Sequence, residues 1–196
     1  MMLLDEHQRR CRCGSTSLAM LPPHIQFNME SPMESPTFSF RVTPKQIELD
    51  RLQQDLLRVS ESELNWIAEG SIQIKCQSTQ QVLATINDSV IYYLEQLACV
   101  LFTLECGHDK TFSVSGDYFN NSFQYTMNHD RTQVTMYDVI EKRIVFTAAY
   151  DDFRNSLLMF FRSALRKIKE IYPELRRNIA FQKYEKIFDS KNWNYR

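Results

Sequence analysis

Histidine and carboxylate side chains are the first candidates for chemistry, because imidazole is the usual general base near neutral pH. Of the four histidines, His108 and His129 are each followed directly by an aspartate. If the two expected loops that carry them meet in space, these pairs can do acid–base chemistry or bind a metal. Aspartate beside a loop histidine is also common in solvated turns. We therefore keep an enzyme with a dispersed His/Asp site as one alternative and assign no catalytic residue.

The five cysteines do not form a metal-binding or disulfide pattern. Cys11 and Cys13 lie close to His7, but a structural zinc site needs four thiolate or imidazole ligands, and no second pair follows at the usual spacing. An odd number of cysteines is typical of free thiols in a protein that is not exported. The sequence therefore predicts no metal and no cofactor, and Cys76 and Cys99 are expected to pack as small apolar residues.

Motifs that bind nucleotides or carry a nucleophile are missing. The sequence has only four glycines, whereas loops that wrap a phosphate need several so that backbone N–H groups can approach the anion. The patterns G-x-G-x-x-G, G-x-x-x-x-G-K-[ST], G-x-S-x-G, S-x-x-K and H-E-x-x-H do not occur. Nucleotide-binding loops, nucleophile elbows and metalloprotease helices are thereby excluded.

Length and composition indicate one domain with a short extension. The chain has 196 residues, of which 43% are hydrophobic, and a net charge of -1. Its best candidate for a membrane span, Val90 to Leu104, is interrupted by Glu95 and Gln96 and falls short of the roughly 18 residues required. The N-terminus lacks the apolar stretch of a secretion signal. We expect a cytoplasmic protein that makes no membrane contact.

Residues 1–35 are expected to form a loosely ordered tail, because they are rich in proline and lack a sustained apolar period. A Met-Glu-Ser-Pro sequence occurs at Met29 and again at Met33. A natural start at one of these methionines is a hypothesis that N-terminal sequencing of the native protein would test. The single folded domain is expected to span residues 36–196.

Apolar periodicity predicts the elements of this domain. Alternation predicts strands, and recurrence every three to four residues predicts helices. The expected strands are 37–43, 71–77, 111–115, 122–128, 133–139 and 143–150, and the expected helices are a short one near 47–57, 88–105, 153–172 and one after Pro173. Short connections between the last four strands favour an antiparallel meander. The predicted fold class is α+β: an antiparallel sheet, made of a four-stranded meander plus the N-terminal strands, with two or three helices packed on one face.

Charge is distributed unevenly along the chain. Residues 45–109 hold ten acidic side chains against four basic ones, whereas residues 154–196 hold eleven basic against four acidic. The basic segment suggests a nucleic-acid-binding alternative, with Arg176 and Arg177 on phosphates and Trp193 or Tyr195 stacked on a base. Solvated basic faces on two amphipathic helices explain the same pattern. The acidic segment suggests a surface for a basic partner protein.

The layout resembles the small immunity proteins encoded beside bacterial polymorphic toxins. Residues 36–172 carry this resemblance, through a helix-first α+β order, the polar strands from Phe112 to Tyr137, and a closing helix that is apolar and then basic. The resemblance implies a cytoplasmic bacterial protein that binds one cognate toxin and blocks its active site.

Together these observations favour a non-enzymatic protein-binding module over nucleic-acid binding and over catalysis, and the resemblance implies an immunity protein that neutralises a cognate toxin by direct binding. The expected binding surface combines the exposed face of the meander with the neighbouring acidic region. Aromatic residues dominate interface hot spots, so they are the candidate anchors. The candidate binding residues are Glu61, Glu63, Trp66, Glu69, Tyr118, Phe119 and Tyr137.

Overall fold

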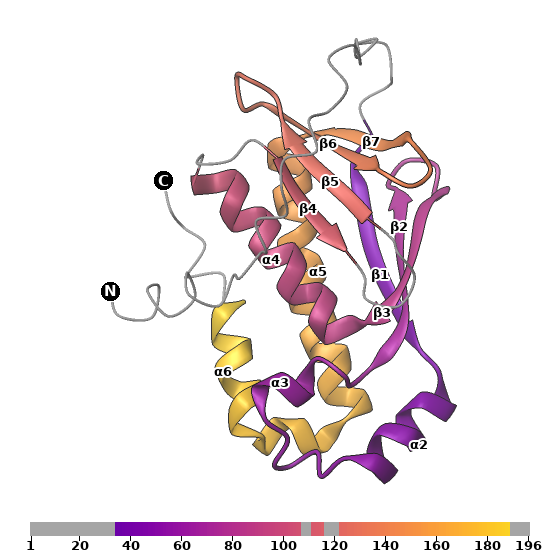
Figure 1. The fold of residues 1–196 in the computed structure, drawn as a ribbon, viewed down its shortest axis with the longest axis vertical. Coiled ribbons are helices and arrows are strands. Elements are labelled where there is room, and N and C mark those ends of the chain that lie inside the picture. Colours follow the sequence, from indigo (N-terminus) through magenta and orange to yellow (C-terminus); the bar gives the residue numbers. More distant parts are fainter. Residues whose placement is uncertain (1–33, 107–110, 116–121, 189–196) are drawn as a thin grey trace. The chain divides into compact units, whose positions relative to one another are not determined.

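The structure, a computed structural model, describes residues 34–106, 111–115 and 122–188. The expected tail of residues 1–35 therefore lies almost entirely outside the described residues. Seven strands and several helices follow one another in the order drawn in Figure 1. They are β1 (Pro36–Val42), α2 (Pro44–Gln53), α3 (Glu61–Leu64), β2 (Glu69–Cys76), β3 (Val82–Ser89), α4 (Val90–Cys106), β4 (Thr111–Ser115), β5 (Ser122–Met127), β6 (Gln133–Asp138), β7 (Arg143–Ala149), α5 (Tyr150–Ile171), the 3-10 helix η1 (Pro173–Arg177) and α6 (Ile179–Ile187).

The strands form two separate antiparallel sheets. Sheet A has the order β1-β2-β3, and sheet B has the order β4-β5-β6-β7. The α+β class is confirmed, but the expectation that the N-terminal strands join the later ones in one sheet was wrong. Strand β3 is the physical reason: it pairs with β2 and leads directly into α4, so sheet A is complete before the later strands begin.

Strand β3 was not among the expected strands, and the expected helix 88–105 overlaps its last two residues. Asp88 in fact belongs to the strand and pairs with Gly70. Ser89 does act at the start of α4, since its Oγ accepts a hydrogen bond from the Tyr92 N–H at 3.3 Å. Ala84 and Ile86 are buried and alternate with exposed neighbours, which is the pattern of a strand with one buried face.

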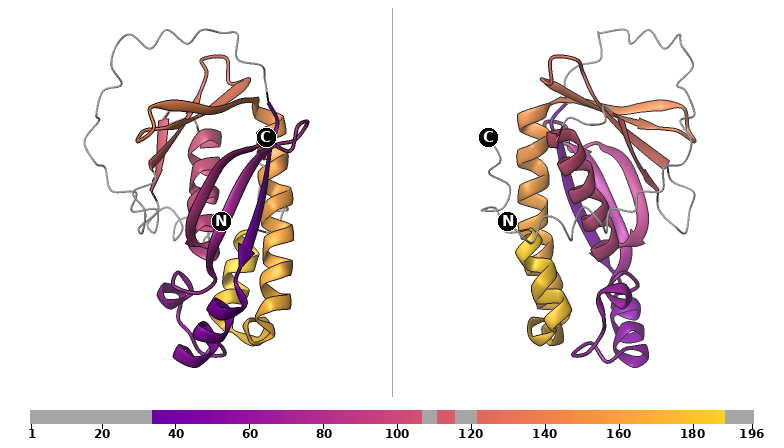
Figure 2. Two further views of the ribbon diagram at one scale, coloured as in Figure 1. Left: turned by 90° about the vertical axis from the view of Figure 1, so that its right-hand side faces the viewer. Right: turned by 60° about the vertical axis from the view of Figure 1, so that its left-hand side comes forward.

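Helices α4 and α5 run side by side and pack against both sheets (Figures 1 and 2). Helix α5 lies along β1 and also contacts β6 and β7, while α4 contacts β2 and β3 of sheet A and β4 and β5 of sheet B. Each sheet turns an apolar face inward. The buried residues of these faces are Phe40, Val42, Ile72, Ile74, Ala84 and Ile86 in sheet A, and Phe123, Tyr125, Met127, Val134, Met136, Phe146 and Ala148 in sheet B.

The two sheets meet at one aromatic side chain of α5. Phe153 is fully buried, and its ring centroid lies 6.5 Å from that of Phe38 in sheet A. The same ring lies 5.8 Å from Tyr125 and 6.0 Å from Phe146, both in sheet B. Phe153 therefore joins the two sheets into one hydrophobic core.

The helical pattern predicted from Phe153 onward is confirmed in α5. The apolar stripe of the helix is buried, and the helix ends at Ile171, two residues before Pro173; the buried residues of the stripe are Phe153, Leu157, Phe160, Phe161, Ala164, Leu165 and Ile168. Pro173 occupies the first turn of η1, where its missing N–H costs no hydrogen bond. Among the described residues, no helix is both long enough and apolar enough to cross a membrane.

Candidate functional site

The candidate binding residues do not form one surface. Glu61, Glu63, Trp66 and Glu69 belong to α3 and the segment that leads into β2, whereas Tyr137 belongs to β6. Figure 1 shows α3 and β6 toward opposite ends of the drawn elements. Tyr118 and Phe119 lie outside the described residues. The candidate residues that the structure brings together are those around α3.

The acidic side chains of α3 have partners within the chain. Glu63 Oε2 accepts hydrogen bonds from the Ser60 N–H and from Ser60 Oγ, both at 2.7 Å. The Ser60 N–H is the main reason why the pKa of Glu63 lies below its ordinary value. Glu61 Oε1 lies 3.5 Å from Lys183 Nζ of α6. These carboxylates therefore fix the helix start and link α3 to α6, in addition to making the surface acidic.

Trp66 has an exposed side chain on a fixed backbone. Its side chain is 54% exposed, although Leu64 and Ile67 on either side are fully buried. The Trp66 N–H donates to the Glu63 carbonyl at 3.0 Å, and the Ile67 N–H donates to the Leu64 carbonyl at 3.2 Å. Because the backbone at Trp66 is fixed, binding through this residue does not require a loop to become ordered.

Other large apolar side chains are exposed on the helices around Trp66. We call this part of the molecule, made of α2, α3, η1, α6 and the loops between them, the helical end. Figure 1 shows these helices together. Leu52 is 83% exposed and Ile179 is 71% exposed, and Leu57 is also exposed. Clusters of exposed apolar residues mark interaction sites more often than single ones do.

A buried carboxylate that the sequence analysis did not identify anchors the helical end. Asp50 of α2 is 3% exposed, and its Oδ2 accepts hydrogen bonds from the Ala68 N–H at 3.1 Å and the Tyr172 hydroxyl at 2.5 Å. Its Oδ1 accepts a third from Gln46 Nε2 at 2.9 Å. Ala68 has a φ of 63°, a left-handed conformation that costs free energy in a residue other than glycine. The bond to Asp50 holds this turn, which follows Trp66 directly.

Asn178 is the second buried polar anchor of the helical end. Its Nδ2 donates to the Val59 carbonyl at 2.9 Å and to the Leu56 carbonyl at 3.3 Å. Its Oδ1 accepts from the Phe181 N–H at 2.8 Å and so caps α6. One side chain thus joins the loop before α3 to the start of α6. No local sequence pattern marks Asn178 for this role, because its partners lie about 120 residues upstream.

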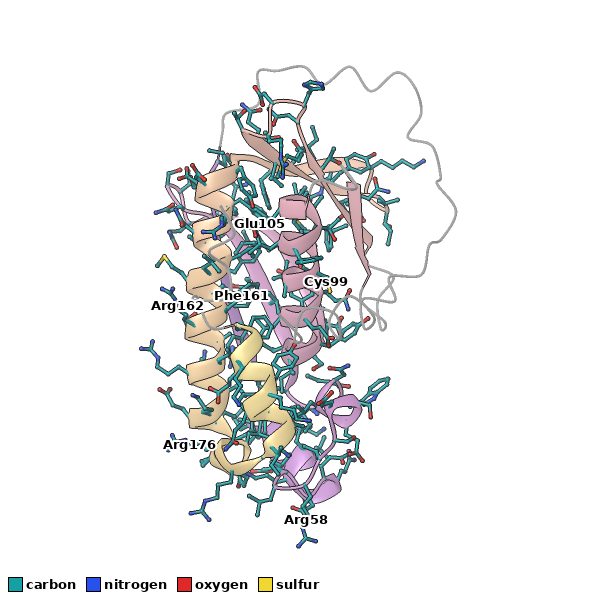
Figure 3. The ribbon with its side chains drawn as sticks, turned by 90° about the vertical axis from the view of Figure 1, so that its left-hand side faces the viewer. Arg58, Cys99, Glu105, Phe161, Arg162 and Arg176 are labelled. Carbon is teal, nitrogen blue, oxygen red and sulfur yellow. The ribbon has the colours of Figure 1, made fainter. Side chains whose placement is uncertain are left out.

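The basic helices form a shallow groove of mixed charge. The groove encloses about 440 Å³ and is lined by Arg166, Lys169, Glu170, Arg176 and Glu185. Lys169 Nζ forms an ion pair with Glu185 Oε1 at 2.5 Å. Arg176 and Arg162 are drawn pointing outward in Figure 3. Two acids among five lining residues make the groove a poor match for a continuous run of phosphates.

Of the two histidine–aspartate pairs, the one at His129 lies within the described residues. His129 is exposed in the turn between β5 and β6, and His108 lies outside the described residues. Asp130 accepts hydrogen bonds from the Thr132 N–H and hydroxyl, which lower its pKa. Within the described ranges, no three His, Cys, Asp or Glu side chains are grouped so as to hold a metal ion. Cys76 and Cys99 are buried thiols.

Buried tyrosines predict a loss of stability at high pH. Burial raises the pKa values of Tyr93, Tyr125, Tyr150, Tyr172 and Tyr184 above their ordinary value of about 10. In the unfolded chain these hydroxyls ionise near pH 10, while in the folded chain they stay protonated. The stabilisation is therefore complete below about pH 10 and is lost as the pH rises above it.

Urea unfolding between pH 8 and pH 11 would measure this effect. We expect the free energy of unfolding to fall above about pH 10, and the tyrosine absorbance at alkaline pH to rise together with unfolding. A smooth titration of all tyrosines near pH 10 in the folded protein would contradict the burial of these hydroxyls.

Comparison with known proteins gives no relative from which function can be transferred: no family model, curated protein or solved structure matches this chain.

Proposed function

We propose that this chain is a non-enzymatic protein-binding module that contacts its partner through the helical end, with Trp66 as the central anchor. The observation that carries the proposal is the half-exposed indole of Trp66 on a backbone fixed between fully buried Leu64 and Ile67. Tryptophan is among the residues most enriched in interface hot spots, and an anchor on a fixed backbone avoids the entropy cost of ordering a loop on binding.

The surroundings of Trp66 support the choice of this surface. Exposed Leu52, Leu57 and Ile179 add apolar area at the same end of the molecule. Glu61 and Glu63 beside Trp66 supply a charged rim, which excludes water from the centre of an interface and favours a basic partner. Such a rim contributes more to association rate and specificity than to affinity.

The partner class follows from the resemblance to immunity proteins. On this proposal the chain acts in the bacterial cytoplasm and covers the active site of a toxin domain. The buried thiols of Cys76 and Cys99 are compatible with a reducing compartment.

Affinity capture from native lysate tests the proposal. The wild-type chain is expected to retain one stoichiometric partner, and Trp66→Ala is expected to weaken capture of that partner by about 30-fold or more, the effect of losing a hot spot of about 2 kcal/mol. The matched control is Met159→Ala, which removes another exposed apolar side chain, 70% exposed on α5. Binding of the purified partner to Trp66→Ala with wild-type affinity would refute the assignment of this surface.

Nucleic-acid binding is the less supported alternative. Arg166, Lys169 and Arg176 line the groove between α5 and η1, but Glu170 and Glu185 line it as well. Lys183, another basic residue of this region, lies beside Glu61. An enzyme with a dispersed His/Asp site has less support still, since His129 is exposed in the turn between β5 and β6.

A further inference from the structure

The outer edge of β3 has backbone groups whose direction follows from the register of sheet A. Beyond the ends of the strands, the Gln77 N–H donates to the Ser35 carbonyl at 2.8 Å, so odd-numbered residues of β2 face β1. The Val90 N–H donates to the Ala68 carbonyl at 3.1 Å, in continuation of the pairing between β2 and β3. The even-numbered residues of β2 and of β3 from Ala84 onward therefore face each other. The register shifts opposite Ile74 and Lys75, so the alternation applies to the part of β3 from Ala84 onward. Because hydrogen-bonding direction alternates along a strand, the odd-numbered residues of this part face away from β2.

Thr85 and Asn87 are the residues that face away. Each directs one N–H and one C=O out of the edge, and both residues are exposed. Within the part of the chain that the structure describes, these backbone groups have no hydrogen-bond partner. The open stretch is bounded on one side by Leu83, whose carbonyl accepts from Arg143 Nη2 at 3.1 Å, and on the other by the start of α4.

Two other edges are covered. Helix α5 runs along the β1 side of sheet A (Figure 2), and Lys167 Nζ donates to the Phe40 carbonyl of that edge at 3.1 Å. In sheet B, the Thr147 carbonyl of β7 accepts from the Glu34 N–H at 2.9 Å. Folded proteins protect sheet edges by cover, charge or proline, because an unprotected edge pairs with another chain. Thr85 and Asn87 provide neither charge nor proline.

We propose that the β3 edge binds an extended peptide segment of a partner protein, which adds to sheet A as a fourth strand. Main-chain hydrogen bonds to Thr85 and Asn87 hold the segment, as in other cases of strand addition. Residues of the segment alternate between the side of buried Ala84 and Ile86 and the polar side of the sheet, so the segment recognised has alternating apolar and polar residues.

The length of the edge selects a peptide over a second copy of this chain. Two outward-facing residues satisfy a segment of only about five residues. A second copy would have to bring its own Arg143 and β7 against the same short stretch, whereas a single strand fits between Leu83 and α4. This proposal concerns a surface on other elements than Trp66 and does not depend on the function proposed for the helical end.

A phage-displayed library of random dodecapeptides, selected on the full-length protein, provides the probe. Selected peptides are expected to alternate in polarity, and hydrogen exchange should show that they protect the amides of Thr85 and Asn87. In the free protein these two amides are expected to exchange rapidly, while the amides of Ala84 and Ile86 are protected by pairing with β2.

The edge is tested separately from the polar face of the sheet. Thr85→Pro removes an outward N–H and is expected to weaken the best peptide about tenfold, while Gln73→Lys, on the same face but in the central strand, should change affinity less than about twofold. N-methylation of the peptide amides on one edge should weaken binding by a similar factor without any change to the protein.

Three results would overturn the proposal. They are a library that yields no binder, selected peptides that bind Thr85→Pro as well as the wild type, and a dimer whose Thr85 amide is already protected without peptide. The last result would assign the edge to a second copy of this chain.

Discussion

Replacing Asp50 by alanine is expected to lower the free energy of unfolding by about 3–5 kcal/mol, because two buried donors lose their acceptor at once. The Ala68 N–H and the Tyr172 hydroxyl both point at Asp50 Oδ2, and neither is exposed to water that could replace it. Loss of the bond to Ala68 also releases a left-handed turn. Urea unfolding followed by circular dichroism would measure the change.

Two further variants separate the parts of this network. Asp50→Asn keeps an acceptor oxygen and is expected to cost less than Asp50→Ala, and Tyr172→Phe should cost about 1–2 kcal/mol through loss of one hydrogen bond. Because Asp50 and Tyr172 are in contact, their effects should not be additive in the double variant. An Asp50→Ala protein destabilised by less than about 1 kcal/mol would show that water reaches this site.

Phe153→Ala is expected to have an effect of similar size, about 3–5 kcal/mol, because it leaves a cavity where the two sheets meet. The ring is fully buried and contacts Phe38, Tyr125 and Phe146. The removed atoms belong to both sheets' cores, so neither sheet can close the gap alone. Chemical denaturation of purified protein provides the measurement.

The controls for Phe153 distinguish cavity formation from a general loss of helix. Phe153→Leu retains most of the volume and should cost less than half as much as the alanine variant. Met159→Ala, on the exposed side of the same helix, should change stability by no more than about 0.5 kcal/mol. Two separate unfolding transitions in Phe153→Ala would mean that the sheets keep independent cores.

Local periodicity was sufficient to predict most elements of the fold. Helix α5 was predicted with its apolar stripe and its end before Pro173, because a long amphipathic repeat is the strongest local signal. The separation into two sheets was not predictable in the same way. It depends on β3, a strand that leads without a turn into α4, where the signals for a strand end and a helix start overlap.

The candidate site was predictable only in part. Trp66 stands out in the sequence as a large aromatic among acidic residues, but its exposure depends on how Leu64 and Ile67 are buried. Tyr137 is of a residue type that is common in hot spots, but it lies in β6 of sheet B and not near α3. Asp50 and Asn178 bond to partners more than 100 residues away in sequence, a separation that no local pattern encodes.

Photocrosslinking at position 66 tests the central claim most directly. A benzoylphenylalanine placed at position 66 of the full-length protein in native cells should form a crosslink to one partner protein, whereas the same group at position 159 should not. If position 66 yields no protein adduct while position 159, or a position on the groove between α5 and η1, does, then the helical end is not the binding surface.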